Sequence, residues 1–297
     1  MLAHLLRFLL AVQVLVGKAL GYLLHRWVHA PLWGMVAWAL VLPLAATLAL
    51  TLESARRSRA PGTPMALWWA AVGGEFRAGV RIFLLRQPWT NGTPVVLPAT
   101  ASPQRLPVVL VHGYLCNHRI WDDVTTDLRA QGHTVLAVNL EPLFTSIDDY
   151  APIIETAVGA LLQATDAKQV VLVGHSMGGL AIRAWMRTFG TARVARVLTL
   201  GTPHAGTQVE PRTRTPNGRQ MLWRSAWLAE LLATETPATR GLVHIALTPQ
   251  DNIVFPQRAQ VLPGVPVTEF PGIGHLQMCL DAKVRAWVLH NMPEHTP

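Results

Sequence analysis

The stretch from Val171 to Gly179 constrains the fold more than any other part of the chain. It begins as a short apolar run and reaches a serine, Ser176, that has glycines two residues away on each side, Gly174 and Gly178. In this G-x-S-x-G pattern, a tight turn from strand to helix holds the serine in a strained conformation, and the small flanking residues avoid clashes. Ser176 is therefore expected to project from the fold as a nucleophile.

The residues on both sides of this motif predict the order strand, turn, helix. Residues 169–173 are rich in valine and leucine, which is typical of a strand buried on both faces. Residues 177–189 are typical of a helix that ends at Gly190. This order favours a nucleophilic serine over the alternative, a glycine-rich turn with an incidental serine.

A serine hydroxyl is a weak nucleophile, so it needs a base to take its proton and a carboxylate to orient that base. The histidines after the motif are His204, His244, His275, His290 and His295. His275 lies in the flexible turn 271–276, after the expected strand 265–270. The others follow a strand too closely, lie inside one, or belong to the C-terminal helix and tail. His275 is therefore the expected base.

The orienting acid must lie between Ser176 and His275 in the chain. The carboxylates there are Glu210, Glu230, Glu235, Asp251 and Glu269. Only Asp251 comes directly after an expected strand, residues 242–247, and open parallel sheets build their sites at strand ends. We therefore expect Asp251 to hold His275, and the alternative is a solvated loop aspartate or an Asx-turn residue.

Acyl transfer also requires two N–H donors for the oxyanion. One is expected to be the backbone N–H of Met177, the residue after the nucleophile. The second is expected from the loop 112–117, which follows the early strand 106–111. Tyr114 is the predicted donor, and the alternative is that Tyr114 packs in the pocket wall while Leu115 supplies the N–H.

Four motifs in this order resemble those of α/β-hydrolases of the bacterial lipase and esterase group, over residues 107–292. The motifs are His112-Gly113, residues 174–179, residues 201–207 and Gly272-Ile273-Gly274-His275-Leu276. The resemblance implies an α/β fold with a doubly wound, mostly parallel sheet and the chain order serine, aspartate, histidine. Thioesterases and acyltransferases share these motifs, and no motif here matches the calcium site of some secreted lipases.

The pattern along the catalytic part predicts the same fold class. Short apolar strands alternate with helical stretches, which indicates parallel βαβ units. The expected helices are residues 119–131, 151–165, 177–189 and 281–292. The hydrolase domain is expected to occupy residues 96–297, about 200 residues, which is a normal size for one domain.

The N-terminal third has a different composition. Residues 30–52 carry no charge, and a helix of this length at about 1.5 Å per residue crosses a hydrocarbon core of about 30 Å. We expect a spanning helix. A cleaved signal peptide is disfavoured because the apolar run starts late and is followed by Arg56, Arg57 and Arg59. A buried core helix is the other alternative.

Residues 2–29 place most of their polar side chains in one narrow arc of an expected helix and leave the rest of its surface almost wholly apolar. The arc contains His4, Arg7, Lys18, Tyr22, His25 and His29. The favoured arrangement is a hairpin that spans the bilayer, with the arc against the second helix. The alternative is a helix in the interface, with the arc toward lipid headgroups.

Positive charge is concentrated in the expected membrane-anchoring helices, residues 1–60. They carry a net +5 of the total +8, so anionic membrane lipid is the expected partner. Nucleic acid is not, because the globular part lacks a basic stripe. The arginines after the second helix favour a cytoplasmic end. The hydrolase domain is then expected on the cytoplasmic side of the cell (inner) membrane, although Arg26 weakly opposes this.

Three further features complete the prediction. Residues 61–95 are expected to form a linker and a tryptophan-containing helix that touches the membrane interface or packs on the domain. Residues 207–240 are longer than a connection needs, and a helix at 219–232 would serve as a lid over an apolar acyl chain or as ordinary core packing. Cys116 and Cys279 are expected to be free thiols.

The features above predict a membrane-anchored serine hydrolase that cleaves a carboxylic ester or lipid substrate through an acyl-enzyme, without a metal or an organic cofactor. A thioesterase, an acyltransferase or an amidase on the same triad is the nearer alternative. A non-catalytic membrane-complex subunit on a hydrolase scaffold is more distant, because binding alone has no need of Ser176, Asp251 and His275. The oligomeric state is not predicted.

Overall fold

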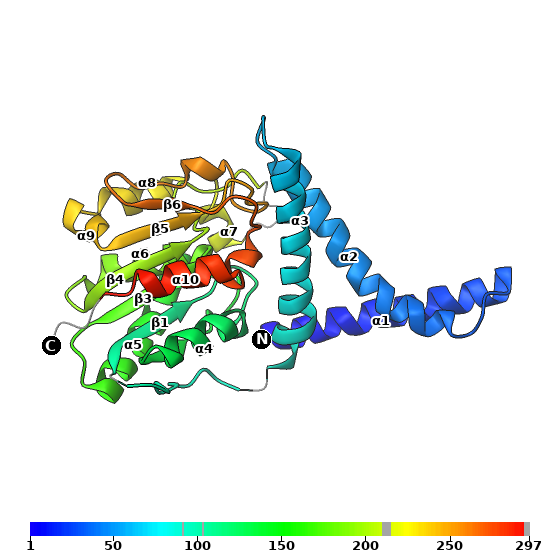
Figure 1. The fold of residues 1–297 in the computed structure, drawn as a ribbon, viewed down its shortest axis with the longest axis horizontal. Coiled ribbons are helices and arrows are strands. Elements are labelled where there is room, and N and C mark those ends of the chain that lie inside the picture. Colours follow the sequence, from blue (N-terminus) through cyan, green and yellow to red (C-terminus); the bar gives the residue numbers. More distant parts are fainter. Residues whose placement is uncertain (91, 103, 210–214, 294–297) are drawn as a thin grey trace.

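The computed structural model of the chain describes residues 1–90, 92–102, 104–209 and 215–293. Its centre is a six-stranded sheet in the order β2-β1-β3-β4-β5-β6, and all five pairings between these strands are parallel (Figure 1). The strands are β1 (Arg105–Val111), β2 (His133–Ala137), β3 (Val170–His175), β4 (Val194–Leu200), β5 (Val243–Leu247) and β6 (Val267–Glu269). The predicted α/β class with a mostly parallel sheet is confirmed.

The order of the strands determines where a site can form. The chain runs outward from β1 to β2 and then returns past β1 to β3, so the direction of winding reverses between β1 and β3. In open α/β sheets, ligands bind at the carboxyl ends of the strands beside such a reversal. All six residues of β3 are buried, as expected for a central parallel strand covered on both faces.

Helices cover both faces of the sheet. One face packs against α5 (Ala151–Thr165), α6 (Met177–Phe189) and α8 (Ala226–Ala233), with Trp185 fully buried. The other packs against α4 (Asp122–Ala130) and α10 (Ala282–His290), with Trp121 fully buried. The shorter helices are η3 (His118–Trp121), η4 (Ile147–Tyr150), α7 (Pro216–Gln220), α9 (Pro237–Gly241), η5 (Gln257–Ala259) and η6 (Leu276–Cys279).

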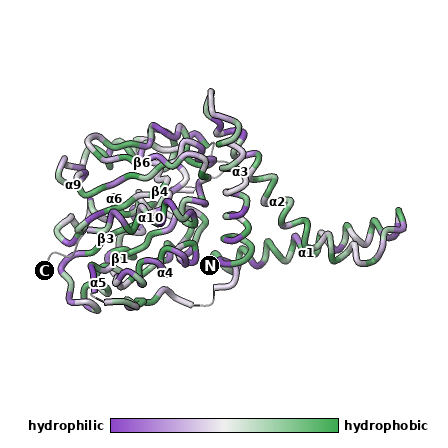
Figure 2. Tube along the Cα trace, viewed as in Figure 1, coloured by the Kyte–Doolittle hydropathy of each residue, from purple (hydrophilic) through white to green (hydrophobic). Residues whose placement is uncertain are grey.

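The first two helices, α1 (Leu2–Val28) and α2 (Gly34–Ser58), form a hairpin that projects from the domain (Figure 1). Apolar residues dominate along both helices (Figure 2). A Cβ on Gly17 would lie 2.4 Å from the carbonyl oxygen of Trp38, and one on Gly21 would lie 2.5 Å from the Cα of Met35. These glycines therefore let the two backbones approach closely, as small residues do between membrane helices.

The polar arc predicted to face the second helix does not do so. Gly17 and Gly21 make that contact, whereas Lys18 is exposed and Tyr22 is 49% exposed. The reason is steric, since only residues without a Cβ allow the close crossing. Helix α1 therefore contacts α2 through a different face from the one that carries the polar arc.

The segment after the hairpin forms α3 (Met65–Gly79), continued by the π-helix η1 (Val80–Arg86) and the short η2 (Gln87–Trp89). One side of α3 packs on the domain, and Glu75 and Ala78 on that side are buried. On the other side Trp69 is 54% exposed. Packing on the domain and contact with a membrane interface are therefore compatible for this segment, because one face of α3 lies on the domain and the other face is exposed.

The helix predicted at residues 219–232 is wrong as one continuous element. It is divided because α7 ends at Gln220 and α8 begins at Ala226, with the Ser225 hydroxyl accepting a hydrogen bond from the N–H of Leu228 as the cap of α8. Leu228 and Leu231 are buried against the domain. Residues 210–214 of the predicted lid segment lie outside the described residues.

Candidate active site

Ser176 occupies the turn between β3 and α6, with φ 54° and ψ −129°. A residue with a side chain holds a positive φ only where its surroundings impose it, and such strain gathers at functional sites. The N–H of Ser176 donates to the carbonyl of Leu200 at the end of β4, at 2.9 Å. The side chain therefore lies at the carboxyl edge of the sheet, and Ser176 is 7% exposed.

Close approach explains the glycines around this turn. A Cβ on Gly178 would lie 2.1 Å from the carbonyl oxygen at the end of β1, and one on Gly174 would lie 2.6 Å from the first turn of α6. A Cβ on Gly113, in the loop after β1, would lie 2.7 Å from the Cβ of Ser176. These positions must lack a side chain for β1, β3 and α6 to meet at the serine.

Asp251 and His275 follow β5 and β6 and are joined by a hydrogen bond. The Nδ1–H of His275 donates to Oδ2 of Asp251 at 2.7 Å, and both residues are buried. The other carboxylate oxygen accepts the N–H groups of Ile253 and Val254 at 2.8 and 2.7 Å. Asp251 therefore orients His275 and also forms the Asx turn that was considered as an alternative.

The serine turn and the histidine loop are joined through His175. Its Nε2–H donates to the carbonyl of His275 at 3.1 Å, and the two imidazole rings lie 4.6 Å apart. A Cβ on Gly201 would lie 3.2 Å from both Asp251 Oδ2 and His275 Nδ1. Ser176, Asp251 and His275 thus share one edge of the sheet. No described hydrogen bond joins Ser176 to the His275 ring, and in enzymes without substrate this bond is often long.

The environment of His275 suits a general base. Burial disfavours the imidazolium, but the carboxylates of Asp251 and, to a lesser degree, Glu75 together outweigh burial and raise the pKa of His275 above its ordinary value. Because Nδ1 is held by Asp251, Nε2 is the nitrogen left to accept a proton. A base whose pKa lies near the working pH, with its ring held in one orientation, is what acyl transfer requires.

The predicted oxyanion donors come from two segments that meet at the serine. Met177 is the first residue of α6, where a backbone N–H has no partner within the helix. The N–H groups of Tyr114 and Leu115, after β1, donate in none of the described hydrogen bonds. The Tyr114 ring packs beside Phe144, with centroids 5.8 Å apart. Tyr114 as the second donor stays a prediction, and Leu115 stays its alternative.

His112 stabilises the conformation of this loop. Its Nε2 accepts the N–H of Leu140 at 3.0 Å, so its Nδ1–H donates to the carbonyl of Gly113 at 2.9 Å. Burial lowers the pKa of His112 to about 4, which keeps the ring neutral. The histidine of the His112-Gly113 motif therefore has a structural role.

Glu75 on α3 contacts the site and was missed by the sequence analysis. Its Oε2 accepts the N–H groups of Leu276 and Gln277 at 2.8 and 3.1 Å, so it holds the backbone directly after His275. A Cβ on Gly274 would lie 2.6 Å from the Glu75 side chain, so Gly274 makes room for α3. The signal that could have found it is that Glu75 is the sole acidic residue in residues 61–95.

Glu75 also titrates near neutrality. Burial raises its pKa to about 7, against the opposing effects of His275 and the two backbone N–H groups. Glu75 therefore changes charge near pH 7 and lies next to His275, the predicted catalytic base. Strongly perturbed carboxyl groups are common at functional sites.

The remaining candidates lie elsewhere or cannot be placed. Glu269 and Glu235 pair with arginines outside the site, and Glu230 is exposed. Glu210 and His295 lie outside the described residues. Asp251 is therefore the carboxylate that the structure brings to His275.

The cysteines and the metal-binding residue types add no second centre in the part of the chain that the structure describes. Cys116 and Cys279 are both free and buried, and burial raises the pKa of Cys116 to about 12. No group of three or more histidine, cysteine, aspartate or glutamate side chains is placed there to hold a metal ion.

Comparison with known proteins points to one family. The family described as "Alpha/beta hydrolase family" matches residues 108–288. The chain is 35% identical over 118 residues to a triacylglycerol lipase of Pseudarthrobacter phenanthrenivorans, covering 37% of this chain and 36% of that protein. It is 30% identical over 141 residues to methylesterase 3 of Arabidopsis thaliana, covering 44% and 52%. The matches thus span about a third to a half of these relatives.

Solved structures share the fold. The mature form of a lipase of Bacillus licheniformis has a TM-score of 0.56 at 16% identity, covering 68% of this chain and 98% of that chain. Lipase B of Aspergillus fumigatus has a TM-score of 0.55 at 14% identity, covering 68% and 57%. At these identities the likeness shows the fold alone.

Proposed function

This chain belongs to the α/β-hydrolase family, and we propose that it is a serine hydrolase that cleaves carboxylic esters with apolar acyl groups. The observation that carries the proposal is the 2.7 Å hydrogen bond between His275 and Asp251, at the sheet edge where the strained turn presents Ser176. The lipase and the methylesterase among its relatives support an ester as the substrate.

The reaction proceeds through an acyl-enzyme. Ser176 Oγ attacks the ester carbonyl carbon while its proton moves to His275 Nε2, and Asp251 stabilises the imidazolium. The backbone N–H groups of Met177 and Tyr114 donate to the oxyanion. The alkoxy oxygen then leaves as the alcohol with the proton from His275. Water, deprotonated by the same histidine, releases the acid. No metal or organic cofactor takes part.

We also propose that residues 1–60 anchor the chain in the cell (inner) membrane. Both α1 and α2 are long and apolar enough to cross a bilayer, and only 11% and 17% of their most apolar windows are buried within the molecule. The start of α1 lies beside the domain, where the Met1 amino group is 2.8 Å from Glu141. This supports a hairpin with both ends on one side, and the arginines at the C-terminal end of α2, Arg56, Arg57 and Arg59, favour the cytoplasm.

Active-site labelling tests the catalytic proposal. Membranes that contain the full chain are treated with a tagged fluorophosphonate, and wild type is compared with Ser176→Ala. We expect the label on the peptide that contains Ser176 and none on the variant. Ester hydrolysis should fall by a factor on the order of 10⁶ in Ser176→Ala and in His275→Ala. An unlabelled, inactive wild type would reject the serine hydrolase.

A substrate panel tests the ester preference. Oxygen esters, thioesters and amides with the same acyl group are compared by kcat/KM, and acyl transfer to an added alcohol is followed in parallel. We expect the oxygen ester to be the preferred substrate and water the main acceptor. A thioester or amide preferred by more than about tenfold would replace the esterase with another acyl-transfer activity on the same triad.

A further inference from the structure

A cavity of about 470 Å³ lies where the N-terminal helices meet the domain. Its walls come from the first half of α1, the second half of α2, the α3 to η1 segment and three loops of the hydrolase domain. This volume is in the range of small-molecule sites. None of the lining residues belongs to residues 207–240, so in the described part of the chain the predicted lid does not border it.

The domain side of the cavity consists of residues next to the catalytic ones. Leu115 follows Tyr114 of the predicted oxyanion loop, Asn252 follows Asp251, and Leu276 follows His275. In three separate loops, the residue that follows a predicted site residue therefore lines this same cavity. Ser176 is not among the lining residues, so a carbonyl that reacts with it would lie just beyond this lining, on the side of the three loops.

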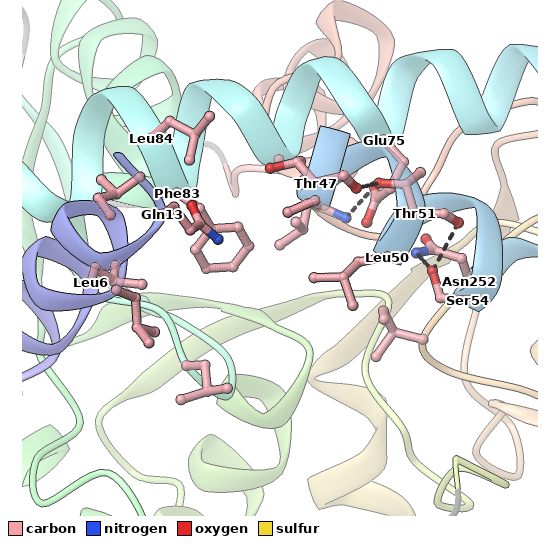
Figure 3. A pocket seen from close by; sticks show the side chains of 17 residues that line it. Leu6, Gln13, Thr47, Leu50, Thr51, Ser54, Glu75, Phe83, Leu84 and Asn252 are labelled. Atoms are coloured by element: carbon pink, nitrogen blue, oxygen red, sulfur yellow. Dashed lines mark hydrogen bonds between the residues drawn. The ribbon is translucent and has the colours of Figure 1, made fainter. Parts of the chain in front are cut away.

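The two ends of the cavity differ in polarity. Figure 3 shows Thr47, Thr51, Ser54, Glu75 and Asn252 gathered with Leu50 at one end, and Leu6, Phe83 and Leu84 with the single polar Gln13 at the other. The polar end is bonded to the catalytic loops. Asn252 Oδ1 accepts the N–H of His275 at 3.1 Å, and Asn252 Nδ2 donates to Ser54 at 2.9 Å. A ligand with one polar end and one apolar end matches this layout, and its polar end would lie beside the triad.

The charges of the lining disfavour an anionic lipid headgroup as the occupant. Glu75 is the one titratable residue among the described residues that line the cavity, and no lysine, arginine or histidine is present to pair with a phosphate. The apolar lining is also incompletely covered by protein, since Leu9 is 47% and Leu50 is 73% exposed. An acyl chain would remove this apolar surface from water.

The same helices offer a route from the bilayer. Other residues of α1 and α2, which do not line the cavity, are exposed: Phe8 is 64% and Leu40 is 66% exposed. If the hairpin crosses the membrane, these side chains contact lipid while Leu6 and Leu50 face the cavity. The same two helices would then border both the cavity and the acyl chains of the bilayer.

We propose that the hairpin forms the acyl-binding wall of the active site, and that the cavity holds the acyl chain of a membrane lipid ester whose carbonyl lies at Ser176. The inference rests on the proposed ester hydrolase and adds its substrate class. The N-terminal helices are then part of the substrate site as well as an anchor.

Tryptophan scanning of the wall tests this. Leu6→Trp on α1 and Leu50→Trp on α2 place extra volume in the cavity. Leu15→Trp and Leu40→Trp are matched controls on the same helices, because these residues are 64% and 66% exposed and do not line it. Full-length proteins in detergent are assayed for kcat/KM on p-nitrophenyl esters from acetate to palmitate.

We expect the ratio of kcat/KM on palmitate to that on butyrate to fall at least tenfold in both wall variants and to stay within twofold of wild type in both controls. An unchanged palmitate-to-butyrate ratio in a wall variant would overturn the acyl-binding wall. An equal fall of this ratio in the control variants would overturn it as well. A wild type that hydrolyses no ester of any length and takes no fluorophosphonate would instead reject the hydrolase itself, so the two failures are distinguishable.

A second measurement does not depend on turnover. The rate of labelling by fluorophosphonates with short and long alkyl chains reports the approach to Ser176 alone. Leu40→Trp, at an exposed position that does not line the cavity, should keep the long-chain preference that Leu50→Trp loses. Equal labelling ratios for wild type, Leu40→Trp and Leu50→Trp would contradict the proposal.

Discussion

Asp251 is expected to set the pH range in which His275 acts as a base. Its carboxylate raises the His275 pKa above the ordinary value, so kcat/KM should rise with pH through an inflection above about 6.5, as the imidazolium loses its proton. Asp251→Asn removes the charge and leaves the burial, so the inflection should move to lower pH. Activity should fall on the order of 10⁴-fold.

The measurement is kcat/KM on a butyrate ester from pH 5 to pH 9. Glu269→Gln is the control, because Glu269 pairs with Arg258 on the surface, away from the site. Its profile should match wild type. An inflection that stays in place in Asp251→Asn would show that another group sets the His275 pKa.

Glu75 makes a second prediction at this scale. Its folded pKa of about 7 lies above the ordinary 4.5, so the stability it contributes is fully present below about 4.5 and is lost as pH rises through 7. Glutamine cannot ionise, yet its carbonyl oxygen can accept the same two N–H groups. Relative to wild type, Glu75→Gln should therefore gain stability between pH 5 and pH 8, by roughly 3 kcal/mol at most.

Thermal unfolding of the full chain in detergent at pH 5 and at pH 8 measures the difference in stability between Glu75→Gln and wild type. Glu75→Ala is the contrasting variant, since it leaves the N–H groups of Leu276 and Gln277 without a partner and should lower the melting temperature at both pH values. A Glu75→Gln effect that is the same at pH 5 and pH 8 would contradict ionisation of Glu75 in the folded state.

The sequence allowed Ser176, Asp251 and His275 to be selected, because each follows a strand and their order in the chain is restricted. The structure places all three at one edge of the sheet. Glu75 could not be selected in this way. It lies about 200 residues before the backbone it holds and precedes the part of the chain that carries the recognisable motifs, so its role depends on how α3 docks.

At the scale of elements, buried and regular segments were predicted well. The helices at residues 151–165 and 177–189 have the predicted bounds, because a clear helical period marks them. The strand expected at 265–270 is only residues 267–269, at the edge of the sheet. The packing of α1 on α2 was not predictable from hydropathy, because it depends on where Cβ atoms are absent.

The segment after β4 is expected to act through packing, because α8 contacts α6 and contributes nothing to the cavity wall. Trp227 donates to Asp148 at 2.9 Å and stacks under Arg187. Trp227→Ala should therefore lower the melting temperature, with a cost toward the lower end of about 3 to 5 kcal/mol, and should affect long and short esters equally.

Trp223→Ala is the comparison variant, since Trp223 is only partly buried in the turn before α8. Its loss of stability should be smaller. Loss of activity confined to long-chain or aggregated esters, with an unchanged melting temperature in either variant, would instead support a lid that opens at a lipid interface.

At the scale of the whole molecule, the N-terminal helices are joined to the catalytic loops. Ser54 on α2 accepts a hydrogen bond from Asn252, and the Ser58 carbonyl accepts one from Gln257, at 2.9 and 2.8 Å. Composition predicted apolar N-terminal helices because hydropathy is a local property of the sequence. The docking of these helices at the site depends on tertiary contacts between a few polar residues, and no local sequence pattern predicts those contacts.

The last prediction concerns the membrane. If α1 and α2 cross a bilayer, burial of their apolar surface holds the chain in place, and salt does not screen that effect. Full-length protein should therefore stay with membranes after washes in high salt and in carbonate. The hydrolase domain should be cut by protease in inverted vesicles and protected in intact spheroplasts. Leu40→Arg with Leu44→Arg is the matched variant, on an exposed face of α2 nearer its middle. Each arginine costs about 3 kcal/mol near the centre of a membrane helix, so carbonate should release a large fraction of it. Release of wild type by salt alone would reject the crossing, and protease protection in inverted vesicles would reverse the proposed side.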